Sequence, residues 1–354
     1  MKEVKKMASK DLVAKTLIRA ICIVSVCIFA ATAGWAQDNL LEAARKEGKV
    51  VLYTTLPGKA CKAVKAAFEE KYPGVKFEYY QAGSLDIIGR YEAERAAGKV
   101  KADLFHITDM VWPLRLKEQG NLLKYDCPEY PAYEYLGEPV AMPGYWAPFR
   151  ILVTAPIVNT NIVGPKTIQS YEDMLKPEYK GMIASGDVST STRAYLNYYG
   201  LRKYYGTKWF EKLAQLDAEY YESSEKATSY CIAGRWPILW ECWAYRYVQY
   251  GLKQGAPIMA VFPKEGVVMV PCPLGIFKQA LHPNAAKLFL NFAYSKECQE
   301  LLVDTLGVYS GRKDVASPEG LPKIDEIKIL KIDYLKAADE REKLVKEWEK
   351  IVGR

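Results

Sequence analysis

The stretch from Glu265 to Leu302 constrains the fold more than any other, because it joins three signals in a fixed order. Residues Gly266 to Phe277 are apolar and rich in β-branched side chains without a helical period, which predicts a strand buried on both faces. A first helix can begin at Pro283 and Asn284, with an apolar face formed by Ala285, Ala286, Leu288, Phe289 and Phe292. A second helix is expected from Ser295, whose hydroxyl can cap it. Such a unit also occurs in α/β enzymes, so the function has to come from the rest of the chain.

Three strand, loop and helix units follow one another in the first third of the chain. Their expected strands are Lys49–Tyr53, Val75–Tyr80 and Ala102–His106. Units of this kind build a mostly parallel sheet, and ligands bind at the carboxyl ends of such strands, where helix N-termini present free amides. Thr54 and Thr55 in the first loop could instead act as ordinary helix caps. The candidate ligand contacts in these loops are Thr54, Thr55, Ser84, Thr108 and Asp109.

A loop dense in hydroxyl groups follows a later short strand, Met182–Ala184. It runs from Ser185 to Thr192 into a helix that bears Arg193. Amide and hydroxyl donors at a helix N-terminus suit a carboxylate, a phosphonate or a similar anion. A solvated loop with an ordinary cap is the alternative. The candidate ligand contacts here are Ser185, Ser189 and Thr190.

Aromatic residues cluster where the expected strand Ile238–Glu241 ends. Aromatic faces can stack on a flat ligand or hold a cation, and a carboxylate can accept a donor. The cluster consists of Trp240, Glu241, Trp243 and Tyr245.

The N-terminus has the pattern of an export signal. Basic residues precede an apolar run from Ala20 to Ala33, and small residues at Gly34 and Ala36 predict cleavage before Gln37. The run of about 14 residues is short for a membrane-spanning helix, which needs roughly 20. Removal of the signal peptide, residues 1–36, leaves 43 basic against 40 acidic residues and lowers the net charge from +7 to +3. We therefore expect a periplasmic protein with no nucleic-acid partner.

Six cysteines remain after that cleavage. An even number in an oxidising compartment permits disulfides, with 15 possible pairings that the sequence cannot rank. Their wide spacing suits buried free thiols equally well, and the lack of a C-x-x-C motif argues against zinc. The six are Cys61, Cys127, Cys231, Cys242, Cys272 and Cys298.

The order of these segments resembles the two-lobed solute-binding proteins of ABC importers, type II, in the branch that includes the ferric-ion binders. The first-lobe stretches that carry the resemblance read F-E-E-K-Y-P-G-V-K-F, E-A-E-R-A-A-G-K-V-K-A-D-L-F and L-K-E-Q-G-N-L-L. The stem Tyr145–Thr154 matches the crossover into the second lobe, and Trp146 within it is a candidate ligand contact. In this family the region of the aromatic cluster faces the cleft between the lobes, so the resemblance implies four further contacts: Trp240, Glu241, Trp243 and Tyr245. The stretch S-Y-E-D-M-L-K-P-E-Y-K-G, Ser170–Gly181, matches the start of that lobe.

The resemblance implies an α/β fold of two Rossmann-like lobes joined by hinge crossovers. Residues 37–146 and 266–314 would form the first lobe, and residues 147–265 the second. The remaining residues, 315–354, form a charged tail with a helical pattern from Glu326 to Ile351. No heptad run persists in it, so we expect a helix that packs on one lobe and not a coiled coil. Its main apolar contacts are expected to be Leu335, Leu344 and Trp348.

The resemblance also implies a function. A monomer without a cofactor would capture a small organic ligand, expected to be anionic, between its lobes and deliver it to an ABC permease in the inner membrane. Ferric iron is one alternative ligand, but Pro57 and Thr108 stand where the histidine and glutamate of the ferric binders fall, and only Tyr245 remains near their tyrosine pair. Iron(III) prefers hard anionic oxygens, and these substitutions remove most of them. A periplasmic ligand sensor is the alternative from another class.

Catalytic patterns are missing from the sequence. It contains no G-x-S-x-G, Walker or H-E-x-x-H motif. The two histidines, His106 and His282, are far apart in the sequence, and a histidine at a strand end more often makes a structural hydrogen bond. We therefore expect that the protein is not an enzyme.

Overall fold

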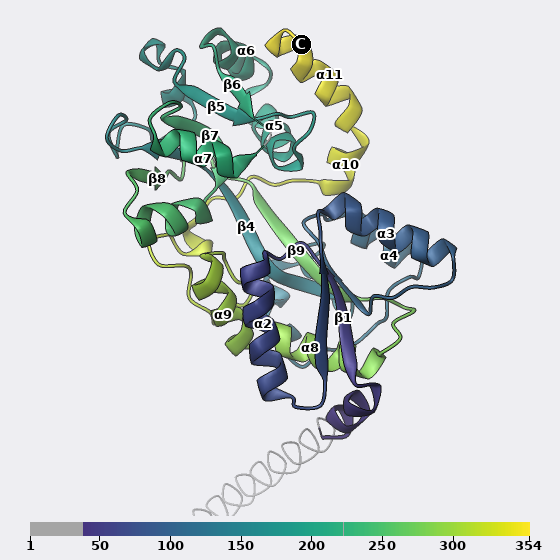
Figure 1. Cartoon of the computed structure of the whole chain (residues 1–354). Helices are drawn as coiled ribbons and strands as arrows, with labels where there is room; N and C mark the ends of the chain where they lie inside the picture. The colour runs from purple at the N-terminus through teal and green to yellow at the C-terminus, as the bar shows by residue number, and fades with distance from the viewer. Residues whose placement is uncertain (1–37, 222) are drawn as a thin grey trace, which may run out of the picture.

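The computed structural model describes residues 38–221 and 223–354, so the predicted signal peptide lies outside the described residues. Two α/β lobes lie one above the other in Figure 1, and two long strands run from one lobe into the other. These crossover strands are β4 (Trp146–Asn159) and β9 (Met269–Ile276). The predicted fold class, two Rossmann-like lobes joined by crossovers, is confirmed.

The first lobe is built by the start of the chain and by the segment that follows β9. Residues 38–47 are helical and lead into the first strand. The strands of this lobe pair in parallel, β1 with β2 and β1 with β3, whereas β9 is antiparallel to β3. Its elements are β1 (Lys49–Thr54), α2 (Gly58–Lys71), β2 (Lys76–Gln81), α3 (Ser84–Ala96), β3 (Leu104–His106), α4 (Val111–Glu118), α8 (Pro283–Tyr294) and α9 (Lys296–Leu306), with the short helices η1 (Tyr130–Ala132) and η2 (Glu134–Leu136) before the crossover.

The second lobe lies between the two crossover strands in the sequence. Its strand β5 is parallel to β6 and β7, and β7 is antiparallel to β4. Three of its elements, β6, α7 and β8, were not predicted, because the strands are three residues long and α7 buries few large side chains. Its elements are η3 (Glu172–Leu175), η4 (Pro177–Tyr179), β5 (Ile183–Gly186), α5 (Thr192–Tyr205), α6 (Lys208–Gln215), β6 (Glu219–Tyr221), α7 (Ser224–Ile232), β7 (Ile238–Trp243), the π-helix η5 (Tyr247–Leu252) and β8 (Ile258–Ala260).

One continuous sheet connects the lobes. Its strand order in the described part of the chain is β2-β1-β3-β9-β4-β7-β5-β6, and β8 pairs with β4. Residues 146–153 of β4 pair with β9, and residues 154–158 pair with β7, so the same strand belongs to both halves of the sheet. All 14 residues of β4 are buried, as expected for a strand covered on both faces.

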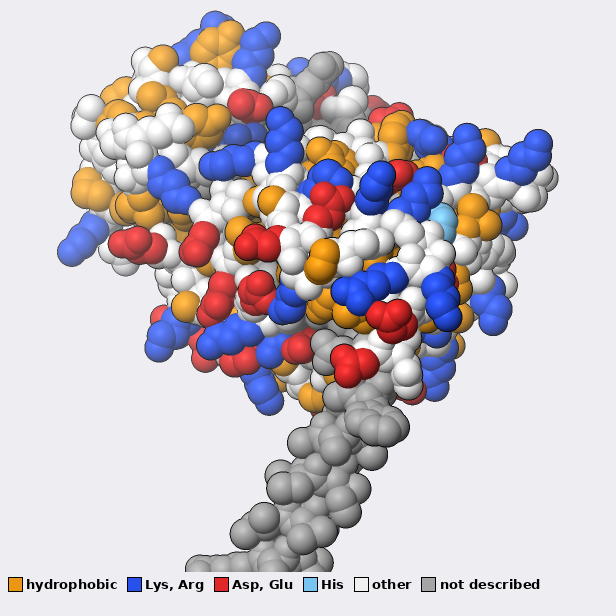
Figure 2. Space-filling view, turned by 60° about the horizontal axis from the view of Figure 1, so that its bottom comes forward, with side chains coloured by type: hydrophobic (Ala, Val, Ile, Leu, Met, Phe, Trp, Pro, Cys, Tyr) orange, Lys and Arg blue, Asp and Glu red, His pale blue; other side chains and the backbone are white. Residues whose placement is uncertain are grey.

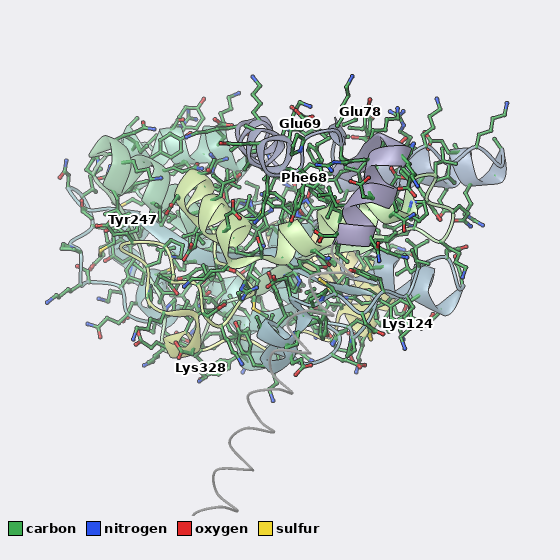
Figure 3. All side chains as sticks on the ribbon, turned by 90° about the horizontal axis from the view of Figure 1, so that it is seen from below. Phe68, Glu69, Glu78, Lys124, Tyr247 and Lys328 are labelled. Atoms are coloured by element: carbon green, nitrogen blue, oxygen red, sulfur yellow. The ribbon has the colours of Figure 1, made fainter. Side chains whose placement is uncertain are left out.

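Aromatic packing fixes α2 and α8 on one face of the first lobe. Phe68 of α2 lies with its ring centroid 5.3 Å from that of Phe289 and 5.5 Å from that of Phe292, both on α8. Figure 3 shows Phe68 on the inner side of α2, with Glu69 nearer the edge of the molecule. The apolar face predicted for α8 is buried. The predicted cap of α9 is also present, because the Cys298 N–H donates to the Ser295 hydroxyl at 3.3 Å.

The C-terminal tail crosses back along the sheet and then packs on the second lobe. The Val267 N–H donates to the Lys328 carbonyl at 2.9 Å, and the Leu330 N–H donates to the Val267 carbonyl at 2.8 Å. The tail then continues through two helices that lie beside α5 and α6 (Figure 1). The prediction for Leu335 was wrong, because it is 40% exposed and Ala337 faces the core in its place. The tail elements are η6 (Ile324–Glu326), α10 (Tyr334–Asp339) and α11 (Arg341–Val352).

Surface charge, cysteine pairing and helix length complete the description of the fold. Basic and acidic side chains are intermixed on the face shown in Figure 2. All six cysteines of the described chain are buried and unpaired, which is the free-thiol alternative of the sequence analysis. No helix among the described residues has the length and apolar character needed to cross a membrane.

Candidate ligand-binding site

Two adjoining cavities lie between the lobes. The first, which we call the Arg193 pocket, has a volume of about 480 Å³ and is lined by α3 and the β3–α4 loop of the first lobe, and by the start of α5 and Trp243 of the second. The other, which we call the tail pocket, has a volume of about 660 Å³ and is lined in addition by α4, α10 and Arg341. Seven residues line both: Leu85, Ile88, Thr108, Asp109, Thr192, Leu196 and Val270.

One helix from each lobe ends with its N-terminus in the Arg193 pocket. Helix α3 begins after Gly83, and its first intrahelical bond runs from the Ile87 N–H to the Gly83 carbonyl. Helix α5 begins after Ser191, whose hydroxyl accepts the Ala194 N–H at 3.3 Å. The first N–H groups of each helix have no partner within the helix, and the helix dipole makes these ends positive. The pocket therefore offers donors from both lobes to an anion.

A buried ion pair lies at the base of α5. The Arg193 Nε is 2.8 Å from the Glu241 Oε2, and the two side chains are 5% and 0% exposed. The Gly186 N–H donates to the Glu241 Oε1 at 2.6 Å. A Cβ at Gly186 would lie 2.8 Å from that oxygen and 2.9 Å from the Arg193 Nη2, so the pair requires glycine there. Among the described residues, the Arg193 Nη1 has no hydrogen-bond partner although it is buried.

Burial and charge act against each other in this pair. Burial raises the pKa of Glu241, and the neighbouring Arg193 only partly opposes that shift. Burial alone would lower the pKa of Arg193, but the Glu241 carboxylate outweighs it and the pKa is raised. The guanidinium of Arg193 therefore stays charged beside the pocket and has one free donor nitrogen.

Two more arginines lie near the crossover. The Arg150 Nη2 donates to the Thr55 carbonyl at 3.0 Å, and its buried Nε has no partner among the described residues. The guanidinium carbon of Arg246 is 5.2 Å from the centre of the Tyr245 ring. Burial raises the pKa of Tyr245, although Arg246, Arg150 and Arg193 all oppose the shift. The region around Tyr245 therefore has more positive than negative charge.

Six of the predicted contact residues line these two pockets. Each lobe contributes three of them, and all are on loops or helix starts at the carboxyl ends of strands, apart from Trp243 at the end of β7. The six are Ser84, Thr108, Asp109, Ser189, Thr190 and Trp243.

The other predicted contacts do not line either pocket. Thr54 is buried, with its hydroxyl 2.7 Å from the His106 Nδ1, and Thr55 bonds the Thr108 hydroxyl at 2.9 Å. Trp146 packs in the first-lobe core, where its indole N–H donates to the Pro139 carbonyl.

The remaining four predicted contacts belong to the second lobe. Trp240 lies 5.5 Å from the ring of Trp209, between packed aromatic rings. Ser185 lies in β5 and not in a loop, and its buried hydroxyl donates to the Gly186 carbonyl of the same strand. Glu241 binds Arg193, and Tyr245 stacks against Arg246, so both act on charges beside the pocket and are not part of its lining.

The structure also adds residues that the sequence did not single out. Ser191 and Thr192 lie within the predicted hydroxyl-rich loop and Arg193 on the helix that follows it, but none of the three was among the predicted contacts. Arg115 lies on α4 and Arg341 on the tail, and no local signal marks either of them.

Metal-binding side chains do not gather in the described part of the chain. Within residues 38–221 and 223–354, no three His, Cys, Asp or Glu side chains are grouped as they would have to be to hold a metal ion. The adjacent tyrosines Tyr198 and Tyr199 are buried on α5, and the Tyr198 hydroxyl donates to Glu347. His106 is fully buried, and burial lowers its pKa well below the usual value.

Sequence comparison places this fold and cleft among known proteins. Residues 63–327 match the sequence profile of the bacterial extracellular solute-binding proteins. A Haemophilus influenzae protein described only as uncharacterized is 25% identical over 319 residues, which are 86% of this chain and 91% of that protein.

Solved structures share the fold. AfuA from Actinobacillus pleuropneumoniae, a periplasmic binding protein with fructose-6-phosphate bound, is 24% identical with a TM-score of 0.71, covering 86% of this chain and 99% of that one. Iron-bound HitA from Pseudomonas aeruginosa is 19% identical with a TM-score of 0.71, covering 85% and 99%. At these identities the likeness shows the fold alone. The profile match extends over well more than half of the sequence, and the chain therefore belongs to the family of bacterial extracellular solute-binding proteins.

Proposed function

We propose that this protein captures a small organic anion between its lobes in the periplasm and delivers it to an ABC permease. The observation that carries the proposal is the pair of helix N-termini, one from α3 and one from α5, that line one pocket together with Arg193. The free Nη1 of Arg193 supports it further, because an unpaired buried donor is costly unless a ligand accepts from it. A phosphate, phosphonate or carboxylate would accept from all three groups.

The two-lobed arrangement supports a binding role without catalysis. Lobes bounded at residues 37–146 with 266–314 and at 147–265 would rotate about β4 and β9, which both halves of the sheet share. Closure would exclude water and strengthen each hydrogen bond to the anion. The binding proteins AfuA and HitA have the same fold, which supports transport more than chemistry.

Ferric iron is the second candidate, because iron-bound HitA shares the fold. The residues of this cleft favour the organic anion over iron. Burial raises the pKa of Tyr245, which disfavours the phenolate that iron(III) prefers. Ser84 and Thr108 in the pocket lining are neutral. Its two carboxylates, Asp86 and Asp109, belong to no group of three His, Cys, Asp or Glu side chains among the described residues that could hold a metal ion.

A thermal-shift screen with matched probes tests the proposal. The pairs are fructose 6-phosphate against fructose and phenylphosphonate against benzyl alcohol, with ferric nitrilotriacetate against nitrilotriacetate alone as a separate iron arm, in which an iron response means a shift with the ferric complex that its chelator does not give. A ligand at about 100 times its Kd adds about 2.7 kcal/mol, which raises the Tm of a chain of this size by a few degrees. We expect a shift with the anions and none with their neutral partners. Shifts with the neutral partners, or an iron response alone, would contradict the proposal.

A further inference from the structure

The C-terminal tail forms one wall of the tail pocket. The family match ends at residue 327, so α10 and α11 lie beyond it. Tyr334, Ala337, Ala338 and Arg341 of these helices line the pocket together with α4 and α3 of the first lobe. The tail therefore reaches the interlobe cleft as well as the surface of the second lobe.

Three hydrogen bonds, one buried and two partly buried, fix the tail in this position. The Tyr334 hydroxyl donates to the Met269 carbonyl of β9 at 2.8 Å, and the Tyr195 hydroxyl of α5 donates to the Ala337 carbonyl. Further along α11, the Arg202 Nη2 donates to the Glu347 Oε2 at 2.7 Å. An element held at three points is pre-organised, and it places Arg341 at the cleft without a large entropic cost on binding.

Charged side chains from three elements meet in the tail pocket. The Arg341 Nη2 donates to the Ser189 carbonyl at 3.2 Å, and its guanidinium carbon lies 4.8 Å from the centre of the Tyr195 ring. Arg115 of α4 lines the same pocket from the first lobe. Asp109 is the acidic group beside them. Burial raises the pKa of its carboxyl, and this effect outweighs the hydrogen bonds from the α4 N–H groups and the charges of both arginines, which act to lower it. Two guanidiniums against one carboxylate leave an excess of positive charge.

The residues shared by the two pockets are mainly aliphatic, with Thr108, Thr192 and the carboxylate of Asp109 beside them. The aliphatic residues that line both pockets are Leu85, Ile88, Leu196 and Val270. Leu85 is 83% exposed, although it lies at the start of α3 on the edge of the cleft. The cleft therefore has a positive group at each end and mainly aliphatic side chains in the middle.

We propose that the tail completes a second anion subsite, formed by Arg341 and Arg115, and that the ligand carries two anionic groups on an apolar or ring-shaped spacer. This inference rests on the proposed function, which accounts for the first anionic group at Arg193. The second group would bind to two guanidiniums from opposite sides of the cleft, so it would also hold the lobes together. The tail would then be a specificity element and not only a surface helix.

Titration calorimetry with phenylphosphonate and 4-phosphonobenzoate tests the second subsite, because the two probes differ only in one carboxylate. The wild-type protein is expected to bind the dianionic probe about tenfold more tightly, the gain typical of one charge-assisted contact. Arg115→Gln and Arg341→Gln are each expected to remove this preference and leave the affinity for phenylphosphonate unchanged. Arg115 is exposed, so its replacement leaves folding intact even if Arg341→Gln lowers the Tm.

Lys346→Gln is the matched control, because it removes one positive charge from the exposed face of α11, where Lys346 pairs with Glu342. This variant should keep the wild-type preference. Equal affinities of the wild-type protein for the two probes would overturn the second subsite and leave the Arg193 site standing. Failure of both probes to bind the wild-type protein would overturn the anion class itself, and with it the subsite.

Discussion

Arg193 and Glu241 form an ion pair that is closed to solvent, with 2.8 Å between the Nε and the Oε2. The pair joins the first turn of α5 to the strand β7 beneath it, and Gly186 of β5 completes it with a backbone donor. It holds the guanidinium of Arg193 at the edge of the Arg193 pocket, where the Nη1 has no hydrogen-bond partner among the described residues. The binding account and the stability of the second lobe both depend on this pair.

Glu241→Gln should destabilise the protein by about 3 kcal/mol, because it leaves the Arg193 charge buried without a partner. Urea unfolding followed by circular dichroism measures this change. Glu78→Gln is the control, since Glu78 pairs with Lys49 on the surface and should contribute less than about 1 kcal/mol. A loss below about 1 kcal/mol for Glu241→Gln would mean that water reaches the pair.

Trp243→Ala should weaken binding of phenylphosphonate by roughly five- to thirtyfold. The guanidinium carbon of Arg193 lies 5.5 Å from the centre of the Trp243 ring, and such a cation–π contact contributes about 1 to 2 kcal/mol when desolvated. Trp243→Phe keeps an aromatic face and should lose less than half of that free energy. Equal titration curves for wild-type and Trp243→Ala would show that the ring does not orient Arg193.

The sequence predicted the fold well because the signals were local and periodic. The apolar β-branched run before α8, the helical spacing of the apolar face of α8 and the hydroxyl of Ser295 were each a local signal, and all three features are present. The short strands β6 and β8 were missed, because three residues give no measurable period. Length and patterning thus determined which elements were recognisable.

The site was only partly predictable. Loops at strand ends brought Thr108, Asp109 and Ser189 into the list for a physical reason, and the structure places them at the cleft. Trp240 was included because of its aromatic character, yet alternation along β7 turns its ring into the packed aromatic cluster of the second lobe. Arg341 could not be found, because its position depends on how a tail over 150 residues from the Ser189 loop folds back on the second lobe.

Acid should loosen the tail through Glu347. Hydrogen bonds from Arg202 and Tyr198 lower the pKa of Glu347 in the folded protein, whereas the pKa of a glutamate in the unfolded chain is about 4.3. A lowered folded pKa gives stability that is present above about pH 4.3 and is lost as the pH falls through the folded value. The difference in Tm between the wild-type protein and Glu347→Gln should therefore be largest near neutral pH and become smaller below about pH 4.3.

The matched control for this pH dependence is Glu342→Gln on the same helix, where the pair with Lys346 is exposed. Its Tm should follow the wild-type profile closely at every pH, because exposed pairs contribute little. A Tm difference for Glu347→Gln that stays constant down to about pH 3 would show that Glu347 is not the titrating anchor.

The six buried thiols should be unreactive in the folded protein. Burial raises the pKa of Cys61 to about 11 and that of Cys127 to about 12, so the reactive thiolate is scarce as well as shielded. With a chain that starts at residue 37, Ellman's reagent should label fewer than one thiol in the native state and six in guanidinium chloride without reductant. A count of four or fewer in denaturant would show that a disulfide forms.

The most direct test of the account is titration calorimetry of phenylphosphonate with the wild-type protein and with Arg193→Lys. Lysine keeps the charge that balances Glu241 but loses the planar fork with its free Nη1, so the Kd should rise about tenfold or more. Arg235→Lys makes the same exchange at an exposed arginine that stacks on Trp236 away from the cleft, and it should bind like the wild type. An unchanged Kd for Arg193→Lys, or no binding by the wild-type protein, would contradict an anion site at Arg193.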